Sequence, residues 1–204
     1  MMNSSRVLAA LVAGVGILAP MNAALTAPKA QLSMITGKVT SQPIGHYEFC
    51  RLHWDECSVR SRSTTARRVT PHGWEVVREI NASVNKQIQP MTDMETTGRE
   101  EVWAYPIDVG DCEDFVLLKR KKLMEAGFSA SDLLITVVRK PDGEGHAVLT
   151  LRSTDGDFVL DNLDDEVKPW SETPYTFLKR QATYDTGRWV TIEDGRDVLV
   201  GATQ

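Results

Sequence analysis

The stretch Gly110-Asp111-Cys112-Glu113-Asp114-Phe115 decides how this 204-residue chain is interpreted, because it places a cysteine at the start of a predicted helix. Apolar residues follow it at spacings of three and four as far as Ala126, which is typical of an amphipathic helix. Asp111 is a suitable N-cap, and Gly127 suits the left-handed position after a last turn. The pattern therefore predicts a helix over residues 111–126 with Cys112 in its first turn.

A cysteine in this position is either a nucleophile or a small buried apolar residue. A thiol attacks as its thiolate, and its ordinary pKa of about 8.5 leaves little thiolate at neutral pH. The unpaired N–H groups of a first helical turn stabilise a thiolate, and so does a neighbouring imidazolium. The helix alone leaves both interpretations of Cys112 open, since burial is the common fate of a free cysteine.

Two polar residues lie at the ends of predicted strands further along the chain. Residues 133–139 and 147–152 have the composition of strands, and a Pro-Asp-Gly turn joins them, which places His146 at a turn-to-strand junction. A third strand, residues 158–160, ends at Asp161. In an antiparallel meander the start of one strand lies beside the end of the next, so we expect His146 and Asp161 to form a hydrogen bond. Together with Cys112 they predict a nucleophile, its base and the residue that orients the base.

These residues resemble the bacterial transglutaminase-like cysteine proteinases. The resemblance runs from about Gly73 to Trp189. It implies a papain-like, transglutaminase-like core in which Cys112, His146 and Asp161 form a catalytic triad. The matching positions are Asn81, Asn85, Trp103, Pro106, residues 110–115, Gly145-His146-Ala147-Val148-Leu149 and Leu160-Asp161-Asn162.

The resemblance also implies a setting for the protein. The best-known member type is a periplasmic, calcium-dependent protease that releases a biofilm adhesin from the cell surface. An inner-membrane receptor that senses a cyclic dinucleotide sequesters that protease. The resemblance thus implies a protein substrate at the surface or in the periplasm, and a Ca²⁺ site beside the nucleophile that matches Asp111, Glu113 and Asp114.

The acidic residues around the cysteine have a physical consequence of their own. Three carboxylates within one turn of Cys112 repel a thiolate and raise its pKa, and a bound cation would cancel that repulsion. Ca²⁺ takes about six to eight oxygen ligands, of which clustered carboxylates supply a part. The alternative is that these acids only complement the helix dipole, at about 0.3–1 kcal/mol each.

The fold predicted from these elements is α+β, with a helical first half that presents Cys112 and an antiparallel sheet of about four or five strands. Thr70-Pro71 predicts the start of a helix that ends at Pro90, and residues 175–182 and 188–192 predict two more strands. We expect residues 91–109 to form a loop, with Trp103 and Pro106 packed over the helix of the nucleophile.

The first residues have the pattern of a secretory signal. One positive charge precedes an apolar run over residues 7–19, and small residues follow it. We expect a signal peptide over residues 1–27, with cleavage between Ala23 and Ala30, and a periplasmic or secreted protein. The apolar run is shorter than the roughly 20 residues of a spanning helix, although the pattern leaves an uncleaved anchor open.

The cysteine count agrees with export, because Cys50 and Cys57 are close enough in sequence to pair and leave Cys112 free. A metal site formed by these two cysteines and His53 is the alternative, although a zinc ribbon needs a second ligand pair. We expect residues 28–70 to be an irregular extension that contains the disulfide, and residues 71–204 to form the proteinase domain.

The net charge of −5 disfavours nucleic acid and anionic membranes as partners. The basic run over residues 60–68 has the composition of a solvated loop, and the cluster Lys119 to Lys122 is expected on the exposed face of the helix.

The predicted chemistry begins with transfer of the Cys112 proton to His146 and attack on a carboxamide carbon. Transfer of the acyl group to water gives an endopeptidase, whereas transfer to an amine gives a transglutaminase. A small-amide or cell-wall peptide hydrolase would use the same residues. A catalytically silent binding module is the alternative of a different class, and it has no need of all three polar groups.

Overall fold

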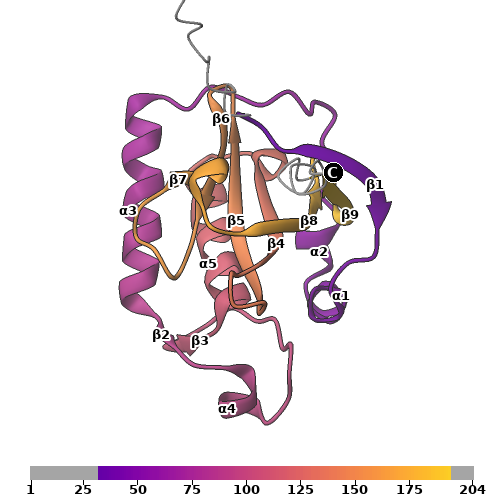
Figure 1. The fold of residues 1–204 in the computed structure, drawn as a ribbon, viewed down its shortest axis with the longest axis vertical. Helices are drawn as coiled ribbons and strands as arrows, with labels where there is room; N and C mark the ends of the chain where they lie inside the picture. The colour runs from indigo at the N-terminus through magenta and orange to yellow at the C-terminus, as the bar shows by residue number, and fades with distance from the viewer. Residues whose placement is uncertain (1–31, 194–204) are drawn as a thin grey trace, which may run out of the picture.

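A computed structural model describes residues 32–193, and seven strands within this range form one antiparallel sheet (Figure 1). The sheet order is β1-β9-β8-β4-β5-β6-β7. Its strands are β1 (Ile35–Thr40), β4 (Leu133–Arg139), β5 (Gly145–Ser153), β6 (Gly156–Leu160), β7 (Lys168–Pro169), β8 (Thr176–Ala182) and β9 (Asp185–Glu193). The α+β class is confirmed, and the prediction of four or five strands is too low, because β1 and β7 extend the sheet at its two edges.

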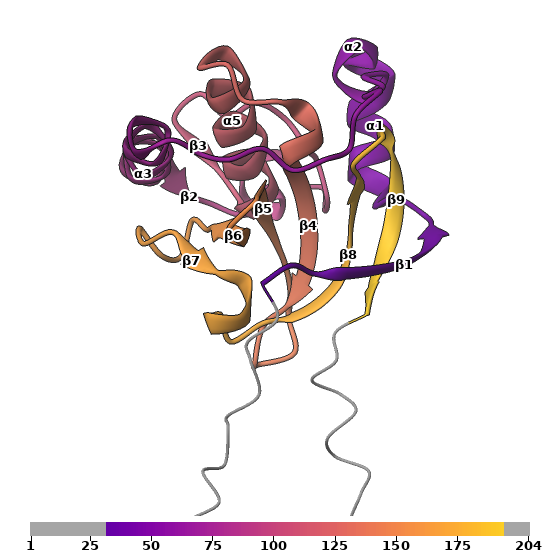
Figure 2. The same cartoon turned by 90° about the horizontal axis from the view of Figure 1, so that it is seen from above.

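Helices cover one face of this sheet, as Figure 2 shows for α3 and α5. The helices are α1 (Ile44–Leu52), α2 (Trp54–Cys57), α3 (Pro71–Gln87), α4 (Asp93–Thr97) and α5 (Cys112–Glu125), with short 3-10 turns at Ala130–Asp132 and Trp170–Glu172. The α3 helix begins where Thr70 accepts a hydrogen bond from the N–H of Gly73, as the Thr-Pro pair predicts. None of the helices between residues 32 and 193 is both long and apolar enough to cross a bilayer.

The alternation of side chains along β5 divides the core into two layers. Leu149 and Leu151 face the helices and pack with Val116 and Leu123 of α5. Val148 points to the other face, where it packs with Trp170 and other apolar side chains. The pairing of β4 with β5 is continuous from Leu133–Leu151 to Arg139–Gly145, so the central hairpin fixes the position of the start of β5.

The segment that we expected to be irregular, residues 28–70, contains β1, α1 and α2 in its described part. Cys50 and Cys57 form a disulfide, and Cys112 is a free cysteine, as predicted. The third side chain close to the two sulfurs is His46, at 3.5–3.9 Å, and not His53. The predicted signal peptide, residues 1–27, lies outside the described residues.

The expected loop over residues 91–109 contains α4 and part of a small parallel ladder. This ladder joins β2 (Gln89–Pro90) to β3 (Val109–Gly110). Because the two strands are parallel, the residues that follow them leave the ladder side by side. The ladder therefore brings α4 to the N-terminus of α5.

Candidate active site

Cys112 is the first residue of α5 and is partly exposed. The N-cap position is Asp111, as predicted, but its side chain makes no capping hydrogen bond. At the other end of the helix, Gly127 has a φ of 94° and closes the last turn, with its N–H donating to the carbonyl of Met124. The helix therefore begins at the cysteine and ends where the sequence indicates.

His146, at the start of β5, and Asp161, directly after β6, lie together at one end of these neighbouring strands. The Nε2 atom of His146 is 2.8 Å from Oδ1 of Asp161, and both side chains are buried. The same Oδ1 accepts from the N–H of Leu163 at 3.0 Å, and Oδ2 accepts from the hydroxyl of Tyr175 at 2.5 Å. Burial raises the pKa of Asp161, but the hydrogen bonds from His146 and Tyr175 outweigh it and hold the pKa below its ordinary value.

The thiol of Cys112 meets the sheet one residue after His146. The N–H of Ala147 donates to Sγ at 3.4 Å, and the thiol itself donates to Oε2 of Glu113 at 3.1 Å. Within residues 32–193, no hydrogen bond joins Sγ of Cys112 to the His146 ring. Nε2 of that ring makes the bond to Asp161, so Nδ1 is the nitrogen that can accept a proton from the thiol. The structure thus brings the three predicted residues to one place, with the thiol proton directed to the carboxyl group of Glu113.

Three carboxylates surround the start of α5, and one of them comes from α4. One oxygen each from Asp93, Asp111 and Glu113 lies within 4.8 Å of the other two. The N–H of Asp93 donates to Oδ2 of Asp111 at 3.3 Å, and Oδ1 of Asp111 is buried with no hydrogen-bond partner in the described part of the chain. Such a cluster, with an unmatched buried oxygen, has the donor set that Ca²⁺ prefers.

Burial and neighbouring carboxylates raise the pKa of three groups at the start of α5. Burial, with the neighbouring Asp111 carboxylate, raises the pKa of Glu113 to about 9. Burial raises the pKa of Asp114 to about 7. Burial and the charge of Glu113 raise the pKa of Cys112 well above its ordinary value, although the N–H of Ala147 opposes that change. In the absence of a cation, these surroundings disfavour the thiolate, as the sequence indicates.

A family model of the bacterial transglutaminase-like cysteine proteinases (BTLCP) matches residues 36–197. The chain belongs to this family. Its members are cysteine peptidases, so the predicted enzyme class is confirmed. The match begins well before Gly73, where the resemblance seen in the sequence began, and it includes the segment with the disulfide.

Solved structures that are similar to this chain include those of LapG from Legionella pneumophila. The calcium-bound form is 24% identical over 55% of this chain and 66% of that chain, with a TM-score of 0.48. The EGTA-treated form is 21% identical over 61% of this chain and 73% of that chain, with a TM-score of 0.49. A comparison with curated protein sequences found no match.

Asp114, the third predicted metal ligand, is not one of the three clustered carboxylates. Its Oδ1 accepts from the N–H of Ala104 at 2.8 Å and so fixes the loop before β3. A side chain at Gly110 would place its Cβ 2.8 Å from Cβ of Asp114 and 3.1 Å from Cβ of Pro106. The glycine of the Gly-Asp-Cys stretch is therefore required for this close approach.

Sequence reasoning missed two residues that the structure places beside the predicted site, Asp93 and Tyr175. A signal for Asp93 exists, because Thr92 and Glu95 form a capping box that marks a helix start directly before it. No local signal shows that this helix start lies beside Asp111. Tyr175 precedes β8, and its approach to Asp161 depends on the sheet order, which the sequence does not show.

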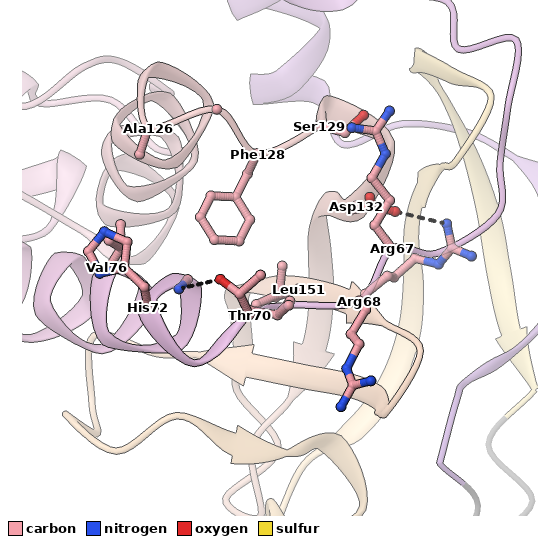
Figure 3. A pocket seen from close by; sticks show the side chains of 14 residues that line it. Arg67, Arg68, Thr70, His72, Val76, Ala126, Phe128, Ser129, Asp132 and Leu151 are labelled. Atoms are coloured by element: carbon pink, nitrogen blue, oxygen red, sulfur yellow. Dashed lines mark hydrogen bonds and ion pairs between the residues drawn. The ribbon is translucent and has the colours of Figure 1, made fainter.

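A cavity of about 290 Å³ lies at the other end of α5, far along the helix from the cysteine (Figure 3). Phe128 and Leu151 are among its apolar lining, and Arg67 and Arg68 are among its polar residues. Its lining includes none of Cys112, His146 and Asp161. The cavity is therefore separate from the predicted chemistry.

Proposed function

We propose that this chain is an exported cysteine endopeptidase that cuts a surface or periplasmic protein through a thioester on Cys112. The observation that supports it most is the buried pair of His146 and Asp161 beside the thiol of Cys112, at the start of a helix. A buried imidazole that is oriented by a carboxylate has the geometry of a general base.

The steps of the reaction follow from this arrangement. Nδ1 of His146 takes the thiol proton, and Sγ of Cys112 attacks the carbonyl carbon of the substrate. The oxyanion lies at the first turn of α5, where the backbone N–H of Cys112 is a donor. His146 then returns the proton to the leaving amine, and the C–N bond breaks to leave a thioester. Water, deprotonated by the same imidazole, hydrolyses the thioester and restores the thiol. Asp161 orients the ring throughout and fixes the tautomer of its neutral form.

We include a Ca²⁺ site in this proposal, with Asp93, Asp111 and Glu113 as ligands. The unmatched buried oxygen of Asp111 and the three clustered carboxylates support it. A bound Ca²⁺ would supply positive charge that favours the thiolate, and it would bind the carboxylate of Glu113, whose Oε2 accepts a hydrogen bond from the thiol. Asp114, bonded to Ala104, would support the loop around this site.

The same proposal includes export of the protein from the cytoplasm and its regulation by a receptor. The predicted signal over residues 1–27 and the disulfide support export, because disulfides persist in oxidising compartments. An inner-membrane receptor as regulator rests on the family resemblance alone.

The test is cleavage of exported and surface proteins by the purified full chain, with calcium or with a chelator, followed by mass spectrometry in H₂¹⁸O. We expect one ¹⁸O in each new carboxyl terminus, and loss of cleavage with the chelator. Cys112→Ala and His146→Ala should each lower kcat/KM by at least about 10³-fold, and Asp161→Asn by at least about 10²-fold. His72→Ala and Asp155→Asn are matched controls at exposed positions and should cleave normally.

Transfer of a primary amine to a glutamine donor, without peptide cleavage, would instead identify a transglutaminase. Cleavage of muropeptides alone would identify a cell-wall hydrolase. If the wild type and Cys112→Ala give the same products, the triad has no catalytic role.

A further inference from the structure

Lys119 is a buried cation on the helix of the nucleophile. Its side chain is 0% exposed, and Nζ has no hydrogen-bond partner among residues 32–193. The expectation that the cluster Lys119 to Lys122 lies on the exposed face is therefore wrong for Lys119 and also for Arg120, which is 2% exposed. Burying an unpaired ammonium is unfavourable, so the position of Lys119 requires an explanation.

Lys119 points toward the seam between α5 and α3. Its Nζ lies 5.9 Å from the centre of the Phe115 ring, and Phe115 packs against Val84 of α3 and against Ile88, which directly follows that helix. Because an α-helix has 3.6 residues per turn, Lys119 lies two turns after Cys112 on nearly the same side of α5. The charges that attract its ammonium are those of Asp161 and Asp165. The side chain therefore lies near the loop that begins with the aspartate of the proposed triad.

Two asparagines of α3 hold the same loop from the other side of the seam. Nδ2 of Asn81 donates to the carbonyls of Asp164 and Asp165, at 3.2 and 3.0 Å. Nδ2 of Asn85 donates to the carbonyl of Asp161 at 2.9 Å and to Oδ1 of Asp165 at 2.8 Å. The loop over residues 161–165 is thus fixed by side chains of α3.

The remaining polar atoms around this loop are complementary to Lys119. The Oδ1 atoms of Asn81, Asn85 and Asn162 are buried without hydrogen-bond partners in the described residues. An ammonium has three N–H donors, and a buried water needs two to four polar partners. Three unmatched acceptors and one unmatched donor group around a single loop are what a small set of bridging waters would satisfy.

We propose that Lys119 is a positioning residue: its ammonium and the two asparagines of α3 hold the loop over residues 161–165, and with it the Asp161 carboxylate that orients His146. Lys119 acts through Asp161 and touches no substrate. The inference rests on the proposed function, because it assigns Lys119 a part in the same triad.

If Lys119 only stabilised the fold, its replacement would lower Tm. If it positions Asp161, its replacement lowers kcat while Tm is kept. Both oxygens of Asp161 already accept hydrogen bonds from His146, Leu163 and Tyr175, so removal of the ammonium leaves neither oxygen unpaired. Burial lowers the pKa of Lys119 to about 7, which means that folding disfavours its charge. Replacement by an apolar side chain of similar length should therefore leave the protein as stable as before, or more stable.

The experiment uses the full chain with Lys119→Met and, as a matched control, Lys122→Met in the last turn of the same helix. We expect Lys119→Met to lower kcat about tenfold or more, with KM within about twofold and Tm equal to or above that of the wild type. Lys122→Met should keep the kcat of the wild type. Lys119→Gln keeps a polar side chain of similar length but removes the charge. Because the proposal assigns the role to the ammonium, this variant should show the same loss of kcat.

An unchanged kcat in Lys119→Met would overturn the inference, and so would a fall in Tm that accounts for the lost activity. If the wild type cleaves no peptide, the proposed function fails, and the rate of iodoacetamide alkylation of Cys112 then tests Lys119 without any substrate. Slower alkylation in Lys119→Met but not in Lys122→Met supports the positioning role. Equal rates in all three proteins contradict it.

Discussion

At the scale of single residues, we expect the hydroxyl of Tyr175 to stabilise the folded protein through Asp161. It donates to Oδ2 of the buried Asp161. Tyr175→Phe removes this donor, and we expect a loss of about 1.5–3 kcal/mol of stability, because a hydrogen bond to a charged group contributes about that much. Since the pKa of Asp161 is lowered in the folded protein, its carboxylate stabilises the fold above its ordinary pKa, and this stabilisation is lost as the pH falls through the folded pKa.

The variant raises the folded pKa of Asp161, so acid unfolding should begin at a higher pH than in the wild type. Circular dichroism along an acid titration measures this shift. Tyr184→Phe, at an exposed position, is the control and should unfold with the wild type. Coincident acid midpoints for Tyr175→Phe and the wild type would show that the hydroxyl does not stabilise the carboxylate.

The sequence correctly located in the fold those residues whose position depends on local signals. Cys112 lies at a helix start that its neighbours determine, and His146 and Asp161 lie at the ends of strands joined by short turns. Asp93 comes to the same place through a parallel pairing of strands 20 residues apart, which no local pattern indicates. Lys119 is buried because α3 and the loop over residues 161–165 cover it, and helical periodicity alone does not show this.

At the scale of elements, a buried ion pair connects the short helix α2 to α5. Nη1 of Arg120 lies 3.2 Å from Oε2 of Glu56, and the guanidinium also donates from Nε to the carbonyl of Leu133. The other oxygen of Glu56 accepts from the hydroxyl of Tyr105 at 2.5 Å. Because the Arg120 side chain is 3% exposed, loss of its partner leaves a charge that water cannot reach.

We therefore expect Glu56→Gln to lower the free energy of unfolding by about 3–5 kcal/mol, toward the lower end because Glu56 is itself partly exposed. Urea denaturation gives this value from the midpoint and the slope. Asp55→Asn changes the neighbouring exposed carboxylate and is expected to stay within about 0.5 kcal/mol of the wild type. A similar small change in Glu56→Gln would mean that α2 is not held by this pair.

Elements were predictable where their periodicity is strong. The strand predicted over residues 133–139 matches β4, and the predicted helix over residues 111–126 differs from α5 by one residue at each end. The region before α3 was not predictable, for two physical reasons. The edge strand β1 pairs with β9, which is about 150 residues away, and α1 and α2 are short helices held by a disulfide and by packing on the sheet.

At the scale of the whole molecule, the acidic cluster couples global stability to pH and to calcium. Burial and the Asp111 carboxylate raise the pKa of Glu113 to about 9, against about 4.3 in an unfolded chain. Between these values the folded protein without calcium holds the proton of Glu113 more tightly than the unfolded chain does. The contribution of Glu113 to stability is therefore fully present below about pH 4.3 and is lost as the pH rises toward 9, by at most about 1.4 kcal/mol per pH unit.

Other buried groups titrate in the opposite sense, since burial lowers the pKa of His46 to about 3 and that of Lys119 to about 7. The measurement is therefore the difference in unfolding free energy between the wild type and Glu113→Gln, from pH 5 to 9, in a chelator and in calcium. With the chelator, we expect the wild type to lose stability relative to the variant as the pH rises.

Calcium at a hundred times its Kd should raise the stability of the wild type by about 2.7 kcal/mol. The affinity for calcium should increase with pH, because the ligands must be deprotonated. A pH-independent difference would contradict the buried, protonated state of Glu113, and an equal gain from calcium in both proteins would exclude Glu113 as a ligand.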